Sequence, residues 1–189
     1  GMQIYRAVGT GALTEDEAGM LVRSFLLAGI DTTVYSLGNT LYCLARHTQQ
    51  WTNLRENPAL IRGAFEEVLR FEAPTQTFFR TTTKMVDVGG IQLGDGEKVL
   101  LFLAAANRDP RRWDNADTFD VTRRAAGHMT FGTGIHGCVG QAVARLETEA
   151  ILTALVKRVA AIEMTGEPRR RLNNTLRGFD SLPLRITPV

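Results

Sequence analysis

The residue with the clearest chemical potential is Cys138, which ends a glycine-rich loop directly before a predicted helix. Free backbone N–H groups and the dipole at a helix amino end favour a thiolate, so Cys138 is expected to be reactive or to bind a metal. The loop, Phe131–Gly140, reads Phe-Gly-Thr-Gly-Ile-His-Gly-Cys-Val-Gly. Its glycines allow the backbone to approach a flat partner closely. No second cysteine lies nearby to complete a zinc site, and Cys43, in an apolar run, is predicted to be a core residue.

A second motif lies inside a long helical pattern. The stretch Ala28–Thr33 reads Ala-Gly-Ile-Asp-Thr-Thr, in which glycine, aspartate and threonine all weaken helix propensity at one place. Such a cluster favours a functional role for Asp31 and Thr32. The alternative for Thr32 is a hydrogen bond back to the preceding helical turn, which mid-helix threonines often make.

These motifs, with Glu67 and Arg70 between them in the chain, resemble the cytochrome P-450 superfamily. The loop matches every fixed position of the pattern Phe-Gly-x-Gly-x-His-x-Cys-x-Gly, and Ala-Gly-x-Asp-Thr-Thr and Glu-x-x-Arg precede it in the required order. The resemblance covers essentially the whole chain and implies a mainly α fold with small β-sheets, the C-terminal half of the family fold. We expect residues 1–189 to form a single haem-binding domain, with the amino-terminal half of the family's longer chains absent.

The resemblance implies a haem b (iron protoporphyrin IX) cofactor with Cys138 as its metal ligand. A thiolate ligand donates electron density to the iron and favours O–O cleavage. His136 and Arg80 match donors to the haem propionates. The remaining implied haem-binding residues are Phe131, Gly132, Gly140, Ala28 and Gly29. Glu67, Arg70 and Arg123 match a buried structural ion network.

The implied activity is that of a monooxygenase, with Thr32 holding dioxygen by a hydrogen bond and Asp31 supplying protons as catalytic residues. The sequence contains no recognised flavin or iron–sulfur segment, so electrons from NAD(P)H are expected to arrive through a separate ferredoxin and ferredoxin reductase. The polar segment 107–130, with five arginines between positions 108 and 124, is a candidate docking surface for the ferredoxin.

Running similarity further resembles bacterial enzymes that oxidise para-substituted benzoates, such as 4-methoxybenzoate demethylases. This implies a small aromatic carboxylic acid as substrate, with contacts from Arg23, Ser24, Thr75, Phe78 and Leu176. Helical geometry is compatible, because Ser24 and Thr32 lie within one arc of about 100° and about 12 Å apart along the axis. An ordinary helix serine remains the alternative for Ser24.

The elements that must position these residues follow from periodicity and from turn signals. Thr14 and Glu17 form a predicted capping box that opens one long helix. The predicted helices cover 15–47, 50–55, 58–71 and 141–162. Extended segments are expected over 76–82, 85–88 and 98–102, forming a small sheet, with short strands such as 182–187 in the tail. The segment 107–130 is expected to be irregular.

Composition excludes several classes of protein. Hydrophobic residues make up 44% of the 189 positions, and 22 basic residues face 20 acidic ones, which argues against disorder and against a charge-driven nucleic-acid binder. The longest apolar run, Val99–Ala106, is shorter than the roughly 20 residues of a membrane-spanning helix. We therefore expect no nucleic-acid partner, no membrane insertion and a cytoplasmic location. Gly1 before Met2 resembles the remnant of a cleaved tag.

Two other classes of function remain open. A truncated, non-catalytic haem-binding or degenerate module would fold around the long helix without shielding an oxidant from water. A zinc or redox-thiol protein would contain metal or a reactive thiol without a haem spectrum. A thiolate-type absorption band in the reduced protein with carbon monoxide separates these classes from a monooxygenase.

Overall fold

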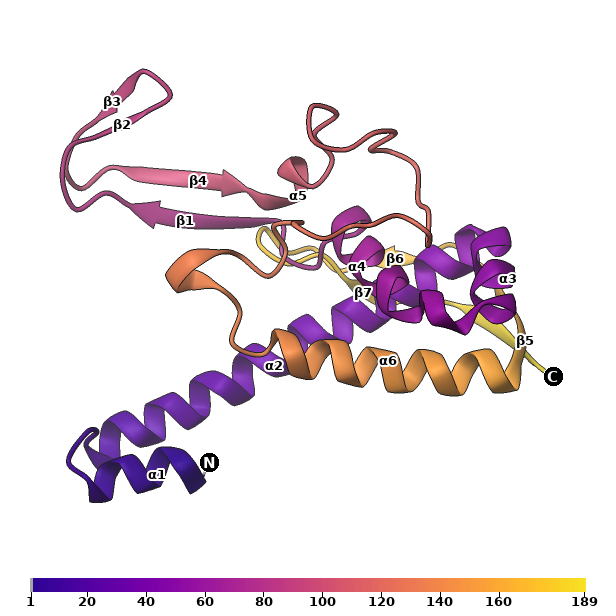
Figure 1. Ribbon diagram of the computed structural model, residues 1–189, viewed down its shortest axis with the longest axis horizontal. Coiled ribbons are helices and arrows are strands. Elements are labelled where there is room, and N and C mark those ends of the chain that lie inside the picture. The colour runs from indigo at the N-terminus through magenta and orange to yellow at the C-terminus, as the bar shows by residue number, and fades with distance from the viewer. Residues whose placement is uncertain (1) are drawn as a thin grey trace.

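The computed structural model describes residues 2–189, and the proposed tag remnant Gly1 lies outside the described residues. The fold is mainly helical with small antiparallel sheets, as predicted (Figure 1). The helices are α1 (Met2–Gly9), α2 (Glu15–Arg46), α3 (Thr48–Glu56), α4 (Ile61–Phe71), α5 (Leu103–Ala106) and α6 (Gln141–Arg158), with short 3₁₀ turns at Pro58–Leu60 and Gly134–His136.

Helix α2 is the longest element and begins at the predicted capping box. The Glu17 backbone N–H donates to Thr14 Oγ1 at 3.2 Å, and the Thr14 N–H donates to Glu17 Oε2 at 2.8 Å. Apart from Ala18, the buried residues of α2 all lie between Tyr35 and Ala45. The amino half of α2 therefore extends from the body, with α1 packed beside it (Figure 1).

The hydrophobic core lies among the carboxyl half of α2, helices α3, α4 and α6, and strand β5 (Val159–Met164). Leu44, Leu54 and Leu152 are at most 1% exposed in this core. The indole N–H of Trp51 donates to the Ala160 carbonyl at 3.2 Å, which ties α3 to β5. Burial of this apolar area is the main favourable contribution to folding.

The sheets are all two-stranded and antiparallel. Strand β1 (Thr77–Thr81) pairs with β4 (Lys98–Phe102), and the two strands extend from the helical body (Figure 1). Strand β2 (Val86–Val88) pairs with β3 (Ile91–Leu93) in a hairpin at the outer end of this pair (Figure 1). The prediction of one small sheet is wrong here, because the hairpin forms its own sheet and includes the unpredicted strand Ile91–Leu93. In the tail, β5 pairs with β8 (Leu184–Pro188), and β6 (Arg169–Arg170) pairs with β7 (Phe179–Ser181).

The predicted helix over 141–162 is wrong at its carboxyl end. Helix α6 ends at Arg158, and residues Val159–Met164 form β5. The strand arises because Val159 and Ile162 bury their side chains while the backbone pairs with β8. Similarly, the predicted helix over 58–71 begins with a 3₁₀ turn, and α1 was not predicted.

Helix α2 is more apolar than its short uninterrupted apolar runs indicate. By length and composition it is the one helix among residues 2–189 that is long and apolar enough to cross a membrane. Eleven per cent of its apolar window is buried within the chain. A core helix of a soluble protein meets the same two criteria, so this property alone is weak evidence for a membrane.

Candidate functional site

The loop before α6 holds Cys138 in a fixed backbone conformation. The Cys138 N–H donates to the Phe131 carbonyl at 2.7 Å, which closes the loop across its two ends. Within it, the Gly137 N–H donates to the Gly134 carbonyl at 3.0 Å. Cys138 is partly exposed, whereas Cys43 is fully buried and burial raises the pKa of its thiol. Cys138 is therefore the accessible thiol of the pair.

Gly132 is required by the shape of this loop. Its φ is +66°, and a Cβ at this position would lie 2.9 Å from the His136 carbonyl oxygen, closer than real Cβ atoms come. An L side chain is disfavoured there on both grounds. The apolar side chains of Ile135 and Val139 are 98% and 75% exposed on either side of Cys138. The loop thus presents a thiol among glycines and uncovered apolar groups.

Helix α2 carries the second predicted motif on an exposed stretch. The helix continues without interruption through Ala28–Thr33, and Thr32 Oγ1 donates to the Ala28 carbonyl at 2.7 Å. This is the back-bond considered as the alternative for Thr32, and it leaves the oxygen free to accept a hydrogen bond. Asp31 is exposed, and a Cβ on Gly29 would meet no atom within 4 Å. A flat group has open access to this face.

The two predicted propionate donors come from different elements. Arg80 lies on β1, partly exposed, and its Nη1 donates to the Phe79 carbonyl at 2.8 Å. His136 is exposed in the 3₁₀ turn of the cysteine loop. Both side chains keep donors for an external acid group.

The structure brings together two of the five predicted substrate residues. Thr75 and Leu176 face each other in an isolated antiparallel bridge, and Thr75 is 7% exposed. Phe78 is 47% exposed on β1. Arg23 and Ser24 are exposed on α2, where Ser24 Oγ donates to the Met20 carbonyl at 2.9 Å. The last bond is the one that an ordinary helix serine makes.

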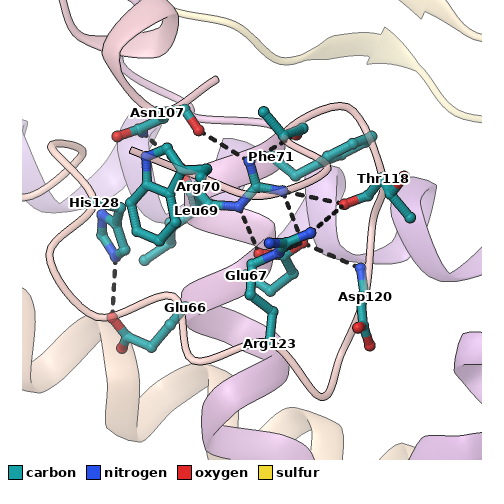
Figure 2. A network of polar contacts seen from close by, with 12 residues as sticks. Glu66, Glu67, Leu69, Arg70, Phe71, Asn107, Thr118, Asp120, Arg123 and His128 are labelled. Atoms are coloured by element: carbon teal, nitrogen blue, oxygen red, sulfur yellow. Dashed lines mark hydrogen bonds and ion pairs between the residues drawn. The ribbon is translucent and has the colours of Figure 1, made fainter. Parts of the chain in front are cut away.

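Glu67, Arg70 and Arg123 form a buried ion network (Figure 2). Arg70 and Glu67 are wholly buried and joined by two hydrogen bonds of 2.7 and 2.8 Å. Arg123 Nε donates to Glu67 Oε1 at 3.2 Å. Arg70 also donates to the carbonyls of Asn107 and Ala116, so the network ties the irregular segment to α4. Removing one partner would leave a buried charge without compensation.

A second network around Glu66 was not predicted. Glu66 Oε2 lies 3.0 Å from His128 Nε2, and Arg145 Nε donates to Glu66 Oε1 at 2.6 Å (Figure 2 shows the Glu66–His128 contact). Burial raises the pKa of Glu66, but the hydrogen bonds from His128 and Arg145 outweigh burial and lower the pKa to about 2. Glu66 adjoins Glu67 in the sequence, yet its partners are 62 and 79 residues further along the chain.

Asn107 is a further buried polar residue that the sequence patterns missed. It is 0% exposed, accepts from the Met129 N–H at 2.6 Å through Oδ1 and donates to Thr130 Oγ1 at 2.9 Å. Thr130 Oγ1 donates in turn to the Leu69 carbonyl at 2.6 Å. These bonds fix the chain that leads into the cysteine loop against α4.

The residues present fit a haem group by the chemistry of their donors. Cys138 supplies one accessible sulfur ligand at the amino end of an 18-residue helix. A Cβ on Gly134 of the loop or on Gly29 of α2 would meet no atom within 4 Å, so both surfaces are open to a flat ring. Arg80 and His136 supply donors for its acid groups. Within residues 2–189, no three or more His, Cys, Asp or Glu side chains form a group able to hold a metal ion.

This combination of helical fold, cysteine loop and buried ion network is characteristic of haem-thiolate proteins. Residues 3–186 match the family model described as Cytochrome P-450, and the chain belongs to that family. It is 57% identical over 180 residues to Cytochrome p450 CYP199A2 of Rhodopseudomonas palustris, covering 95% of this chain and 44% of that protein. It is 40% identical over 173 residues to the biotin biosynthesis cytochrome P-450 of Bacillus subtilis, covering 91% and 44%.

Solved structures agree with these relationships. The structure of cytochrome P-450 CREJ superposes with a TM-score of 0.92 at 34% identity, covering 97% of this chain and 47% of that one. The chain thus spans somewhat less than half the length of the relatives it matches.

Proposed function

We propose that residues 1–189 form a single haem-binding unit, the carboxyl-terminal portion of a haem-thiolate monooxygenase that inserts one oxygen atom from O2 into an organic substrate. The observation that carries the proposal is Cys138, an accessible thiol in a glycine-lined loop before α6, in a chain of the cytochrome P-450 family. When bound, haem b supplies the activation of O2 with electrons from NAD(P)H.

The roles of the chain's own residues follow from their positions. Cys138 would bind the haem as a thiolate, favoured by the helix dipole, with Phe131 packed beside the sulfur. Arg80 and His136 would donate hydrogen bonds to the haem carboxylates. The remaining contacts are assigned to small residues that allow a close approach: Ala28, Gly29, Gly132 and Gly140.

Proton delivery is assigned to Asp31 and Thr32. The Asp31 carboxyl is exposed one residue before Thr32, whose Oγ1 donates to the Ala28 carbonyl and keeps lone pairs that can accept a hydrogen bond. A proton passed from solvent to Asp31 would reach Thr32 Oγ1 through water, because neighbouring residues of a helix do not face each other. We further propose a ferredoxin and its reductase as electron donors, and a cytoplasmic location.

The proposed substrate is a small para-substituted benzoic acid that is hydroxylated or O-demethylated. Arg23 and Ser24 would hold its carboxylate, while Thr75, Phe78 and Leu176 pack on the ring. The pairing of Thr75 with Leu176 supports a wall built from these two segments. Binding of 4-methoxybenzoate should shift the haem spin state, and its methyl ester should bind much more weakly. Equal binding of acid and ester would contradict the carboxylate contacts.

The decisive test is the absorption spectrum of the reduced, haem-loaded protein with carbon monoxide. The wild-type chain should give a thiolate-type band, and Cys138→Ser should abolish it. Replacement of Cys43, which is wholly buried, serves as the control and should leave the band in place. A thiolate band that persists in Cys138→Ser would contradict the ligand assignment.

A non-catalytic haem-binding or degenerate module is the second candidate function, favoured by the exposure of the α2 face around Ala28 and Gly29. An open site lets water reach the oxidant before substrate does. Haem binding without coupled substrate oxidation, measured as product formed per NAD(P)H consumed, would support this candidate over the monooxygenase.

A further inference from the structure

The carboxylate of Glu66 contacts both chain segments that flank the cysteine loop. On the preceding side, Glu66 Oε2 lies 3.0 Å from His128 Nε2. On the following side, Arg145 of α6 donates to Glu66 through Nε at 2.6 Å and through Nη2 at 3.2 Å. One side chain on α4 therefore joins the entry of the loop to the helix at its exit.

His128 is connected to the backbone of Cys138 through Phe131. The rings of His128 and Phe131 lie 5.6 Å apart between centroids, and His128 Nδ1 accepts from the Thr130 N–H at 3.2 Å. The Phe131 carbonyl accepts from the Cys138 N–H at 2.7 Å. The His128 side chain is 3% exposed, so its position is set by this packing.

Arg145, the second partner of Glu66, also contacts Phe131. The guanidinium carbon lies 4.5 Å from the Phe131 ring centroid, a cation–π distance, and Arg145 Nη1 donates to Gln141 Oε1 at 2.8 Å. Phe131 is thus held between a histidine and an arginine that share the same carboxylate. Charge-assisted hydrogen bonds of this kind are stronger than neutral ones, and Glu66 is 20% exposed, which limits screening by solvent.

We propose that Glu66, with His128 and Arg145, is a positioning residue that fixes the backbone of the cysteine loop and thereby the direction of the Cys138 sulfur. The effect on a haem ligand rests on the proposed function, whereas the effect on the loop itself does not. The buried Glu67 on the same helix contacts an earlier part of the irregular segment, at Asp120 and Arg123, so the two adjacent glutamates hold different parts of the chain.

The test uses Glu66→Gln and a matched control on the same pair of helices. Arg62 of α4 and Glu149 of α6 form an ion pair of 2.8 Å and line, with Glu66 and Arg145, one pocket between the two helices. No hydrogen bond or ion pair among the described residues joins Arg62 or Glu149 to the loop. Amide hydrogen exchange in the haem-free protein should become about tenfold faster over residues 128–138 in Glu66→Gln, because charged hydrogen bonds that oppose local opening are lost. Glu149→Gln should leave exchange in this segment unchanged.

A second variant, Arg145→Met, keeps the proposal falsifiable if Glu66→Gln does not fold. The Arg145 side chain is 39% exposed, so its loss spares the core, and it should also accelerate exchange over 128–138. Unchanged exchange in Arg145→Met or in folded Glu66→Gln, or equal acceleration in Glu149→Gln, would overturn the proposal.

The haem-loaded protein gives a separate readout. In Glu66→Gln and Arg145→Met, part of the thiolate-type band of the reduced carbon monoxide complex should be replaced by the band of a neutral thiol ligand, while Glu149→Gln keeps the wild-type spectrum. An unchanged band in both loop variants would overturn the part of the proposal that concerns the sulfur. Absence of any haem spectrum in the wild-type protein would instead contradict the proposed function and leave the exchange result valid.

Discussion

The ionised side chain of Glu66 makes the stability of the folded chain depend on pH. Its pKa in the folded chain is about 2 against an ordinary 4.5, so the ionised form is favoured by folding. This contribution is complete above about pH 4.5 and is lost as the pH falls towards 2. Glu66→Gln should therefore be less stable than the wild type at neutral pH by on the order of 2 kcal/mol, and the difference should shrink in acid. Urea unfolding at a series of pH values measures it.

Asp109 provides the control for this prediction. Its pKa is also lowered to about 2, through hydrogen bonds from Arg111, but the Arg111 side chain is 88% exposed. Solvent screens such a pair, so Asp109→Asn should change the unfolding free energy much less than Glu66→Gln. A difference for Glu66→Gln that stays constant from neutral pH to pH 3 would show that its charge is not responsible.

The polar contacts of some site residues can be predicted from the sequence, and those of others cannot. The Glu67–Arg70 pair is three residues apart on one helix, a spacing that sequence patterns record. His128 and Arg145 contact Glu66 only in the folded chain, because they lie 62 and 79 residues from it in the sequence. Asn107 is hidden for the same reason, since its role is to satisfy backbone groups of α4 and of the loop entry. Polar contacts of long sequence separation leave no local signal.

At the level of elements, α2 was predicted closely because its capping box and its helical period agree over the whole length. The sequence predicts helix over β5 because Val159 and Ile162 continue the three- and four-residue spacing of Leu152 and Val156 in α6. The partner strand that overrides this spacing, β8, lies at the end of the chain. The hairpin strand Ile91–Leu93 has no buried face, and at three residues it is too short for an alternation of apolar and polar residues to predict a strand. Short pairings depend on tertiary contacts more than on propensity.

The glycines of α2 give a prediction at this scale. A Cβ on Gly29 or Gly19 meets no atom within 4 Å, so alanine at either position should stabilise the haem-free chain by up to about 1 kcal/mol through helix propensity. Gly29→Ala should in addition weaken haem binding, because the methyl group occupies the proposed approach of the ring. Chemical denaturation and haem titration measure the two effects. Equal haem affinity of Gly29→Ala and Gly19→Ala would place the haem elsewhere.

The whole molecule has an uneven distribution of apolar surface. The core is concentrated around α3, α4, the carboxyl half of α2 and β5, whereas the amino half of α2 exposes Leu26, Leu27 and Ile30 at 58–65%. Helix α6 likewise exposes Val143 and Leu146. Contiguous apolar surface of this kind marks a region that binds another protein segment or self-associates. At 100° per residue, Leu26, Leu27 and Ile30 lie on a different side of α2 from Ala28 and Thr32 of the proposed haem site.

The amino half of α2 should therefore drive self-association of the purified chain. Leu27→Lys should lower the fraction of dimer and larger species in sedimentation velocity at a given concentration, because a charge on this face opposes desolvation. Its unfolding free energy should change by no more than about 0.5 kcal/mol, since an exposed side chain makes few stabilising contacts. Leu172→Lys, at a position 98% exposed and remote in sequence, is the control and should leave association unchanged. Association that is equal in all three proteins would mean that another surface brings the chains together, and the α2 face would then be solvated in solution.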